Sequence, residues 1–414
     1  MSASVKSSEI TEYKYRWVIM IMASLVLACI QFGVFISAGA AGSLMGPEYG
    51  LSSMQFAMVS TMPYLMGFLG GIVCGTIADR TSIRKVMIIA LIIAIVGSGI
   101  RVINITFASM LISCLLLGVS LAALNANSAK LLRVWFPKKG LGVAMGVYTT
   151  GASVGAAAAL KLGVLLTVPQ SFTLALVLVV IALLAWIIFG KTSEFEAIAH
   201  EPVLEHIGDV IKNKYVWIVS LFMFFLFGCS VTEQTFINSA FTDLTGDPNT
   251  ASTIAMTNSI CVALGGIIMP IFVGKLKRLK PVMIICAILM CINMITVLIL
   301  PYSWFTWARM VLQGIYMGTL LPLGKSLPAL IPNIKEEHLG AAGGIQSMFQ
   351  NLGAWLIPAY ILAPIITSLT GATNLAYYVG AGICVLLSGL CVLFIPETGT
   401  TIEGKKAREA ELAK

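Results

Sequence analysis

The sequence contains little charge, and acidic residues are the scarcer kind. Charged residues make up 11% of the 414 residues, with 26 Lys and Arg against 18 Asp and Glu, whereas hydrophobic residues make up 58%. Soluble globular domains carry about 25% charged residues, so this chain has too little polar surface to cover a water-soluble globule. The composition therefore excludes an ordinary soluble protein and predicts an integral membrane protein.

Motifs for catalysis, metals and cofactors are also lacking. The nine cysteines show no C-x-x-C spacing and the three histidines form no ligand pair, so we expect no metal site and no cofactor. The sequence has no phosphate-binding glycine loop, which an ATP-driven pump needs. It also shows no nucleophile–base pair that would indicate an enzyme. The basic residues are spread over separate short loops, so nucleic acid is not an expected partner.

Long apolar runs are what the sequence has instead. A helix needs ~20 mostly apolar residues to cross a hydrocarbon layer ~30 Å thick, whereas strands of membrane barrels are ~10 residues long and alternate. We therefore expect an all-α integral membrane fold, surrounded by lipid, with twelve transmembrane helices. The predicted spans are residues 16–41, 55–77, 86–104, 106–131, 141–166, 171–190, 215–240, 251–273, 281–300, 304–330, 339–365 and 374–395.

Basic residues gather in alternate loops, which predicts the orientation. Lys and Arg occupy the loops after spans two, four, eight and ten, the central loop and both terminal segments. The other loops contain Glu48, Asp243 and Asp247 and essentially no Lys or Arg. Short basic loops stay on the cytoplasmic side of a membrane. We therefore expect both termini in the cytoplasm and the protein in a cell membrane, such as a bacterial inner membrane. We expect a monomer.

The two halves of the sequence repeat each other at a nearly constant offset. This duplication predicts two six-helix bundles, 1–190 and 215–396, joined by a linker over 191–214 and followed by a tail over 397–414. An apolar stripe within 203–211 predicts a short amphipathic helix in the linker, although a plain solvated linker is the alternative. The matching segments are Leu69–Ile72 with Leu264–Ile267, Val86–Ile89 with Val282–Ile285, Lys130 with Lys325, and Gly155 with Gly353.

The loop after the second span carries a motif. Residues 75–85 read G-T-I-A-D-R-T-S-I-R-K, which resembles the G-x-x-x-D-R-x-G-R-K loop of the major facilitator superfamily, with Ser82 in place of the usual glycine. The resemblance covers the whole chain and implies two pseudo-symmetric bundles. It also implies that this loop belongs to a gate rather than to a substrate site. Lys130 and Lys325, near the cytoplasmic ends of spans four and ten, are further gate candidates. The gate residues taken from the motif are Gly75, Asp79, Arg80 and Arg84.

The junction of spans four and five narrows the resemblance. Residues 127–142, N-S-A-K-L-L-R-V-W-F-P-K-K-G-L-G, look like the same junction in oxalate/formate and nitrate/nitrite type anion porters. The nitrate pattern expects an arginine in spans two and eight, and the oxalate pattern expects cations in spans eight and eleven. Neither is present here. The resemblance therefore implies a small anion as substrate without naming it.

Ionisable residues inside the spans point to the same class of substrate. Each costs ~2.5–3.5 kcal/mol to insert and so needs a reason. Lys161 lies beside small residues, and Arg309, Gln313 and Tyr316 form a stripe that can grip a carboxylate. The alternative for both cations is that they extend to the outer surface. The set comprises five cations, Arg101, Lys130, Lys161, Arg309 and Lys325, against one acid, Glu233.

Glu233 has two interpretations. A buried carboxyl can serve as a proton carrier, or it can form a structural ion pair with Lys161 or Arg309. Uncharged polar residues complete a predicted substrate cavity, with interhelical hydrogen bonding as the alternative. These residues are Gln31, Asn127, Gln346 and Gln350.

The sequence thus predicts a secondary transporter that moves a small organic anion by alternating access, as an antiporter or a proton symporter. An exporter of hydrophobic or uncharged compounds is one alternative, and it would tolerate loss of Lys161 and Arg309. A membrane receptor that does not transport is another, although no appended signalling domain supports it.

Overall fold

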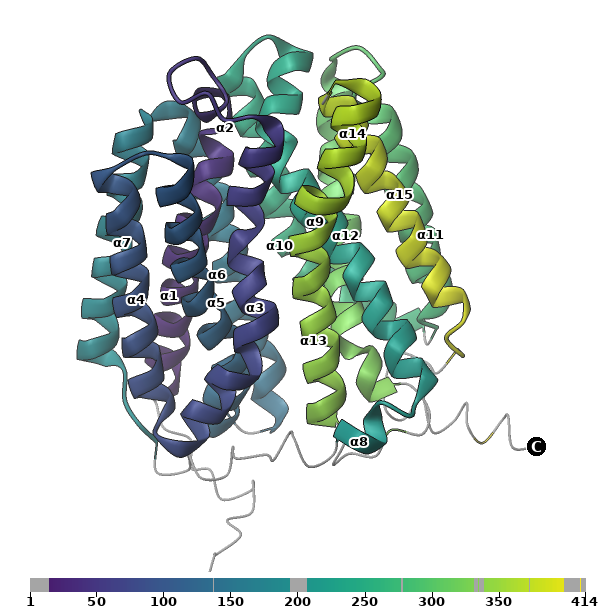
Figure 1. Ribbon diagram of the computed structural model, residues 1–414. Coiled ribbons are helices and arrows are strands. Elements are labelled where there is room, and N and C mark those ends of the chain that lie inside the picture. The colour runs from purple at the N-terminus through teal and green to yellow at the C-terminus, as the bar shows by residue number, and fades with distance from the viewer. Residues whose placement is uncertain are drawn as a thin grey trace, which may run out of the picture. The chain divides into compact units, whose positions relative to one another are not determined.

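The protein is helical throughout the part that the computed structural model describes, residues 15–136, 138–193, 207–276, 278–330, 334, 339–371, 373–397 and 410 (Figure 1). Its elements are α1 (Arg16–Gly39), α2 (Ala41–Leu44), α3 (Ser53–Arg80), α4 (Ile83–Ile103), α5 (Phe107–Trp135), α6 (Lys138–Leu165), α7 (Val168–Phe189), α8 (Ile207–Val210), α9 (Lys214–Thr245), α10 (Pro248–Leu276), α11 (Lys280–Val297), α12 (Trp304–Leu330), α13 (Leu339–Leu356), the π-helix η3 (Ile357–Leu362), α14 (Ala363–Thr370) and α15 (Asn374–Leu393).

Every predicted span coincides with one of these helices, and span 339–365 coincides with the continuous run α13–η3–α14. Within the described residues, nine helical segments are long and apolar enough to cross a bilayer. The predicted all-α membrane fold is therefore confirmed. Helices extend past the predicted spans, as α9 does to Thr245, because the backbone ladder continues beyond the apolar layer until a residue such as Gly246 (φ 71°) ends it.

Several helices begin where polar side chains satisfy their first backbone N–H groups. Thr106 and Ser109 form a reciprocal pair of hydrogen bonds at the start of α5, and Thr167 and Gln170 do the same for α7. Such capping boxes supply partners that the first turn of a helix lacks. They fix the points at which the chain re-enters a helix after each short loop.

The chain divides into two compact units, residues 1–52 with 62–201, and residues 53–61 with 202–414. The predicted domain limits stay a prediction. In the linker, the described residues include the short helix α8, whereas residues 203–206 of the predicted amphipathic helix lie outside the described ranges.

Glycines let helices of the first unit approach to backbone contact. A Cβ placed on Gly151 or Gly155 of α6 would fall on the carbonyl oxygen of Ser24 or Ala28 in α1. Gly118 of α5 faces the backbone of Pro63 in α3 in the same way. Small residues allow this close packing where water does not drive association.

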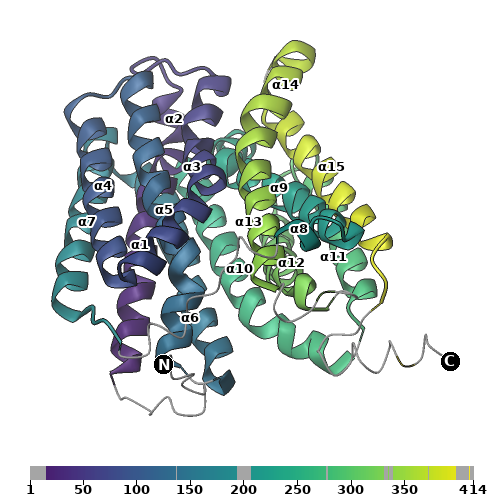
Figure 2. The same ribbon diagram turned by 60° about the horizontal axis from the view of Figure 1, so that its bottom comes forward.

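The second unit repeats these contacts at the matching positions. Gly353 of α13 faces the carbonyl oxygen of Phe224 in α9, and Gly314 of α12 faces that of Asn258 in α10. Figures 1 and 2 show α13 running alongside α9. The sequence repeat is therefore also a repeat of helix contacts.

Candidate functional site

A buried polar network joins α11 and α12 in the second unit. Arg309 Nε donates to Asn293 Oδ1 at 2.8 Å, and Arg309 Nη2 donates to the Asn293 backbone oxygen at 3.1 Å. Arg309 Nη1 reaches the Thr296 backbone oxygen at 3.2 Å, and Nη2 also donates to the Thr296 hydroxyl. Arg309 is only 7% exposed. Its guanidinium is thus engaged with α11 and holds two helices together.

The network continues from Asn293 toward Glu233 on α9. Asn293 Nδ2 donates to Gln313 Oε1 at 2.7 Å, and Gln313 lies close to the Glu233 carboxyl. Glu233 Oε1 and Gln313 Nε2 are nevertheless buried without a hydrogen bond. The amide nitrogen of Gln313 and one carboxyl oxygen of Glu233 therefore lack a hydrogen-bond partner although the two side chains lie close together.

Glu233 makes no ion pair with Arg309, because that guanidinium is bonded to Asn293 and Thr296. The predicted pairing of Glu233 with Arg309 is therefore wrong for this conformation. The pairing with Lys161 concerns two different units and stays untested. Among the described residues of the second unit no cation pairs with Glu233, and a buried carboxylate without one is costly.

The sequence analysis did not identify Asn293 and Thr296, which accept hydrogen bonds from the Arg309 guanidinium. The two residues are three apart on one face of α11, inside an otherwise apolar span. A polar pair at that spacing in an apolar helix was a usable signal of an interhelical contact. It does not show which neighbouring helix supplies the partner.

Arg101 is the buried cation of the first unit. It is 0% exposed, Nη2 donates to the Gly33 backbone oxygen at 2.9 Å, and the guanidinium carbon lies 4.7 Å from the centre of the Phe172 ring. Nε and Nη1 have no hydrogen-bond partner. Gly33 is the repeat counterpart of Glu233, at the offset of 200 residues that also relates Trp17 to Trp217 and Cys29 to Cys229. Equivalent positions therefore contact a cation in one unit and carry an acid in the other.

Lys161 lies on α6, half-buried and about one turn from its last residue, Leu165. Ala159 and Gly163 contact Gly39 of α1. Because Lys161 is two residues from each of them, it lies roughly 200° around the helix and points away from α1. Lys161 therefore lies on a different face of α6 from the residues that contact Gly39.

The predicted cavity residues divide by burial. Asn127 Nδ2 donates to the Ala123 oxygen of the same helix at 2.9 Å. Gln346 Nε2 on α13 donates to the Gly324 oxygen on α12 at 2.7 Å and so joins two helices. Gln31 has a buried Oε1 without a hydrogen bond. Tyr316 and Gln350 are half-buried.

The predicted gate is described only in part. Gly75, Asp79 and Arg80 lie on α3, and the structure describes the helix there but not the surroundings of these three residues. Arg84 Nη2 donates to the Ile187 backbone oxygen at 3.0 Å and so closes the last turn of α7. Lys130 on α5 is half-buried and Lys325 on α12 is exposed, each five residues before the end of its helix.

Comparison with known proteins adds a family and relatives. The family model described as "Major Facilitator Superfamily" matches residues 23–239 and 223–414. A probable nitrate/nitrite antiporter of Thermus thermophilus is 24% identical over 405 residues, covering 88% of this chain and 89% of that protein. A gallate transporter of Pseudomonas putida is 27% identical over 147 residues, covering 34% of this chain and 31% of that protein.

Among solved structures, a bacterial homologue of the human lysosomal transporter Spinster, in an inward-facing and unoccupied conformation, matches with a TM-score of 0.70. The match covers 92% of this chain and 96% of that chain at 14% identity. At that identity the likeness concerns the fold. It agrees with the helical architecture described above.

Proposed function

Since the chain belongs to the Major Facilitator Superfamily, we propose that it is a secondary transporter of a small anion, working by alternating access. The observation that carries the proposal is the charge inside the spans: five cations stand against the single acid Glu233. Such an interior attracts an anion and repels a cation. The transported anions named for relatives, nitrate or nitrite and gallate, have the same sign.

Lys161 is the cation that we assign to the substrate. Arg101 is fully buried and Arg309 is bonded to α11, so neither offers its charge to a ligand in this conformation. Lys161 is half-buried on a face of α6 that does not pack on α1. Arg309 then acts by holding α12, which also carries Gln313 and Tyr316, rather than by direct contact.

The substrate is a small carboxylate or an inorganic oxyanion such as nitrate. Both present oxygen acceptors that an ammonium and nearby amides can bind. The carboxylate is our proposal from the sequence, with Lys161 in place of Arg309 as the cation, whereas the nitrate/nitrite relative spans most of the chain. We propose Glu233 as the group that takes up a proton if transport is proton-coupled.

A thermal-shift screen of the purified protein tests this function. The ligands are small carboxylates, nitrate, nitrite and, for contrast, hydrophobic cations. A bound ligand at ~100 times its dissociation constant adds ~2.7 kcal/mol to the free energy of unfolding. Stabilisation by anions supports the proposal, and stabilisation by hydrophobic cations alone would replace it with the exporter alternative.

A further inference from the structure

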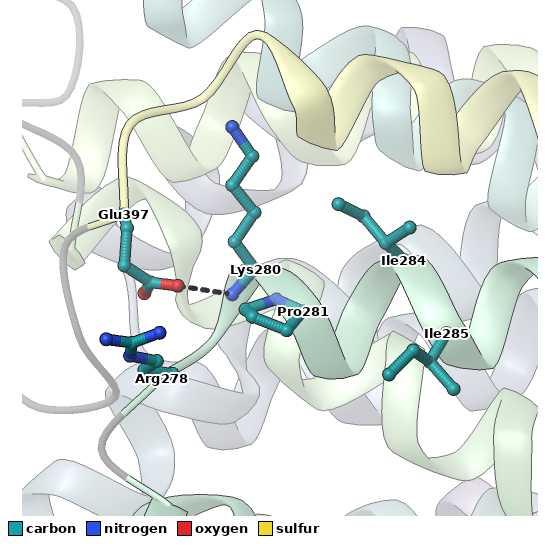
Figure 3. A pocket seen from close by; sticks show the side chains of 6 residues that line it. All are labelled: Arg278, Lys280, Pro281, Ile284, Ile285 and Glu397. Carbon is teal, nitrogen blue, oxygen red and sulfur yellow. Dashed lines mark hydrogen bonds between the residues drawn. The ribbon is translucent and has the colours of Figure 1, made fainter.

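A pocket of about 580 Å³ opens at the start of α11 in the second unit (Figure 3). Its lining combines two cations, one acid and three apolar side chains. Glu397 comes from the segment after α15, whereas the others lie on or just before α11. The lining residues are Arg278, Lys280, Pro281, Ile284, Ile285 and Glu397.

The charges in this pocket are not equally available. The Glu397 carboxylate accepts from the backbone N–H of Leu279 at 3.0 Å and from that of Lys280 at 3.1 Å, so the start of α11 takes up its charge. Lys280 Nζ donates to the Leu393 oxygen at 2.6 Å, which leaves two of its donors. Arg278 is exposed and makes no hydrogen bond or ion pair with other described residues.

The apolar wall of the pocket continues along α11. Ile285, Ile288, Leu289 and Ile292 are 55%, 43%, 42% and 54% exposed. Their spacing of three and four residues places them on one helix face. In a membrane helix, an exposed apolar stripe faces acyl chains. The pocket therefore lies where this stripe ends and basic side chains begin.

That boundary has the chemistry of a lipid headgroup site. Lys275, Lys277, Arg278 and Lys280 make the junction of α10 and α11 basic, and this junction is predicted on the cytoplasmic side. The cytoplasmic leaflet contains anionic lipids that basic pockets recognise. A guanidinium binds a phosphate with two parallel hydrogen bonds. The apolar stripe supplies a surface for a chain attached to that phosphate, which a free phosphate does not need.

We propose that this pocket binds one anionic glycerophospholipid. Its phosphate contacts Arg278, and an acyl chain follows the stripe from Ile285 to Ile292. The site is separate from the transported anion and does not depend on the proposed function.

The test compares apparent melting temperatures of the purified protein in neutral detergent with added phosphatidylglycerol, phosphatidylcholine or glycerol phosphate. Arg278→Gln removes the proposed phosphate contact. Lys212→Gln is the matched control, because Lys212 is a 78% exposed lysine on the same predicted side, paired with Asp209 and outside the pocket. Native mass spectrometry counts retained phosphatidylglycerol as a second readout that does not depend on stability.

Phosphatidylglycerol is expected to raise the melting temperature of the wild type and of Lys212→Gln more than phosphatidylcholine does, with one molecule retained. Arg278→Gln is expected to lose both the extra shift and the retained lipid. Equal shifts with the two lipids, or an unchanged shift in Arg278→Gln, would overturn the proposal. An equal shift with glycerol phosphate would also overturn it, since it would show a site for a soluble anion.

Discussion

At the scale of single residues, Asn293 links the buried groups of the second unit. It accepts from Arg309 Nε and donates to Gln313 Oε1. Asn293→Ala leaves a buried guanidinium and a buried amide without these partners, so we predict a loss of about 3 kcal/mol in the free energy of unfolding. Thermal unfolding in detergent measures it. Thr173→Ala is the control, because Thr173 is exposed and its hydroxyl donates to the Pro169 oxygen within its own helix, and an equal loss there would contradict the network.

Glu233 tests proton coupling at the same scale. Its carboxyl is 3% exposed, and Oε1 has no hydrogen bond. Glu233→Gln keeps the shape and fixes the neutral state, so we predict that the variant stays folded and exchanges anions but no longer accumulates them when a proton gradient is applied. Uptake into proteoliposomes with and without a gradient measures this. Gradient-driven accumulation by the variant would remove Glu233 from the coupling role.

The sequence could identify the charged residues but not what each one contacts. The stripe of Arg309 and Gln313 was predicted from spacing along one helix. Its partners, Asn293 and Thr296, come from another helix, and a single sequence does not state which helix faces which. The sequence therefore predicts substrate contact for Arg309, whereas the structure bonds it to α11.

At the scale of elements, helix contacts depend on glycines that have no room for a side chain. A Cβ on Gly353 would fall on the Phe224 carbonyl oxygen, whereas one on Gly343 of the same helix would meet nothing within 4 Å. Backbone cannot move aside cheaply, so we predict that Gly353→Ala costs about 1–3 kcal/mol. Gly343→Ala should be neutral or stabilising, because alanine favours helix. Equal melting temperatures for the two variants would contradict the packing.

The elements themselves were largely predictable. Length and hydropathy give the twelve helices, since an apolar run of about twenty residues has few alternatives in a bilayer. Their ends were less predictable, because α9 and α3 continue past the apolar runs into polar residues. The glycine repeat pointed to helix contacts, and the structure shows which carbonyl oxygens those glycines face.

At the scale of the whole molecule, the basic loops predict the orientation in the membrane. We predict that alkaline phosphatase fused after Asp247 is active, since the loop that follows α9 is expected outside the cytoplasm. The same reporter fused after Lys414 should be inactive, and a fluorescent protein there should fluoresce. The reverse pattern would overturn the assignment of both termini to the cytoplasm, and with it the leaflet of the proposed lipid site.

The central claim for the whole molecule is that it moves an anion with the help of Lys161. The most direct measurement is counterflow of the best anion from the ligand screen into proteoliposomes containing wild type, Lys161→Ala or the charge-retaining Lys161→Arg. A hydrogen bond to a charged group contributes about 1.5–3 kcal/mol, or roughly a ten- to hundredfold change in affinity. We predict a loss of that size in Lys161→Ala, partial recovery in Lys161→Arg and equal melting temperatures without ligand. Unchanged counterflow in Lys161→Ala would contradict the account.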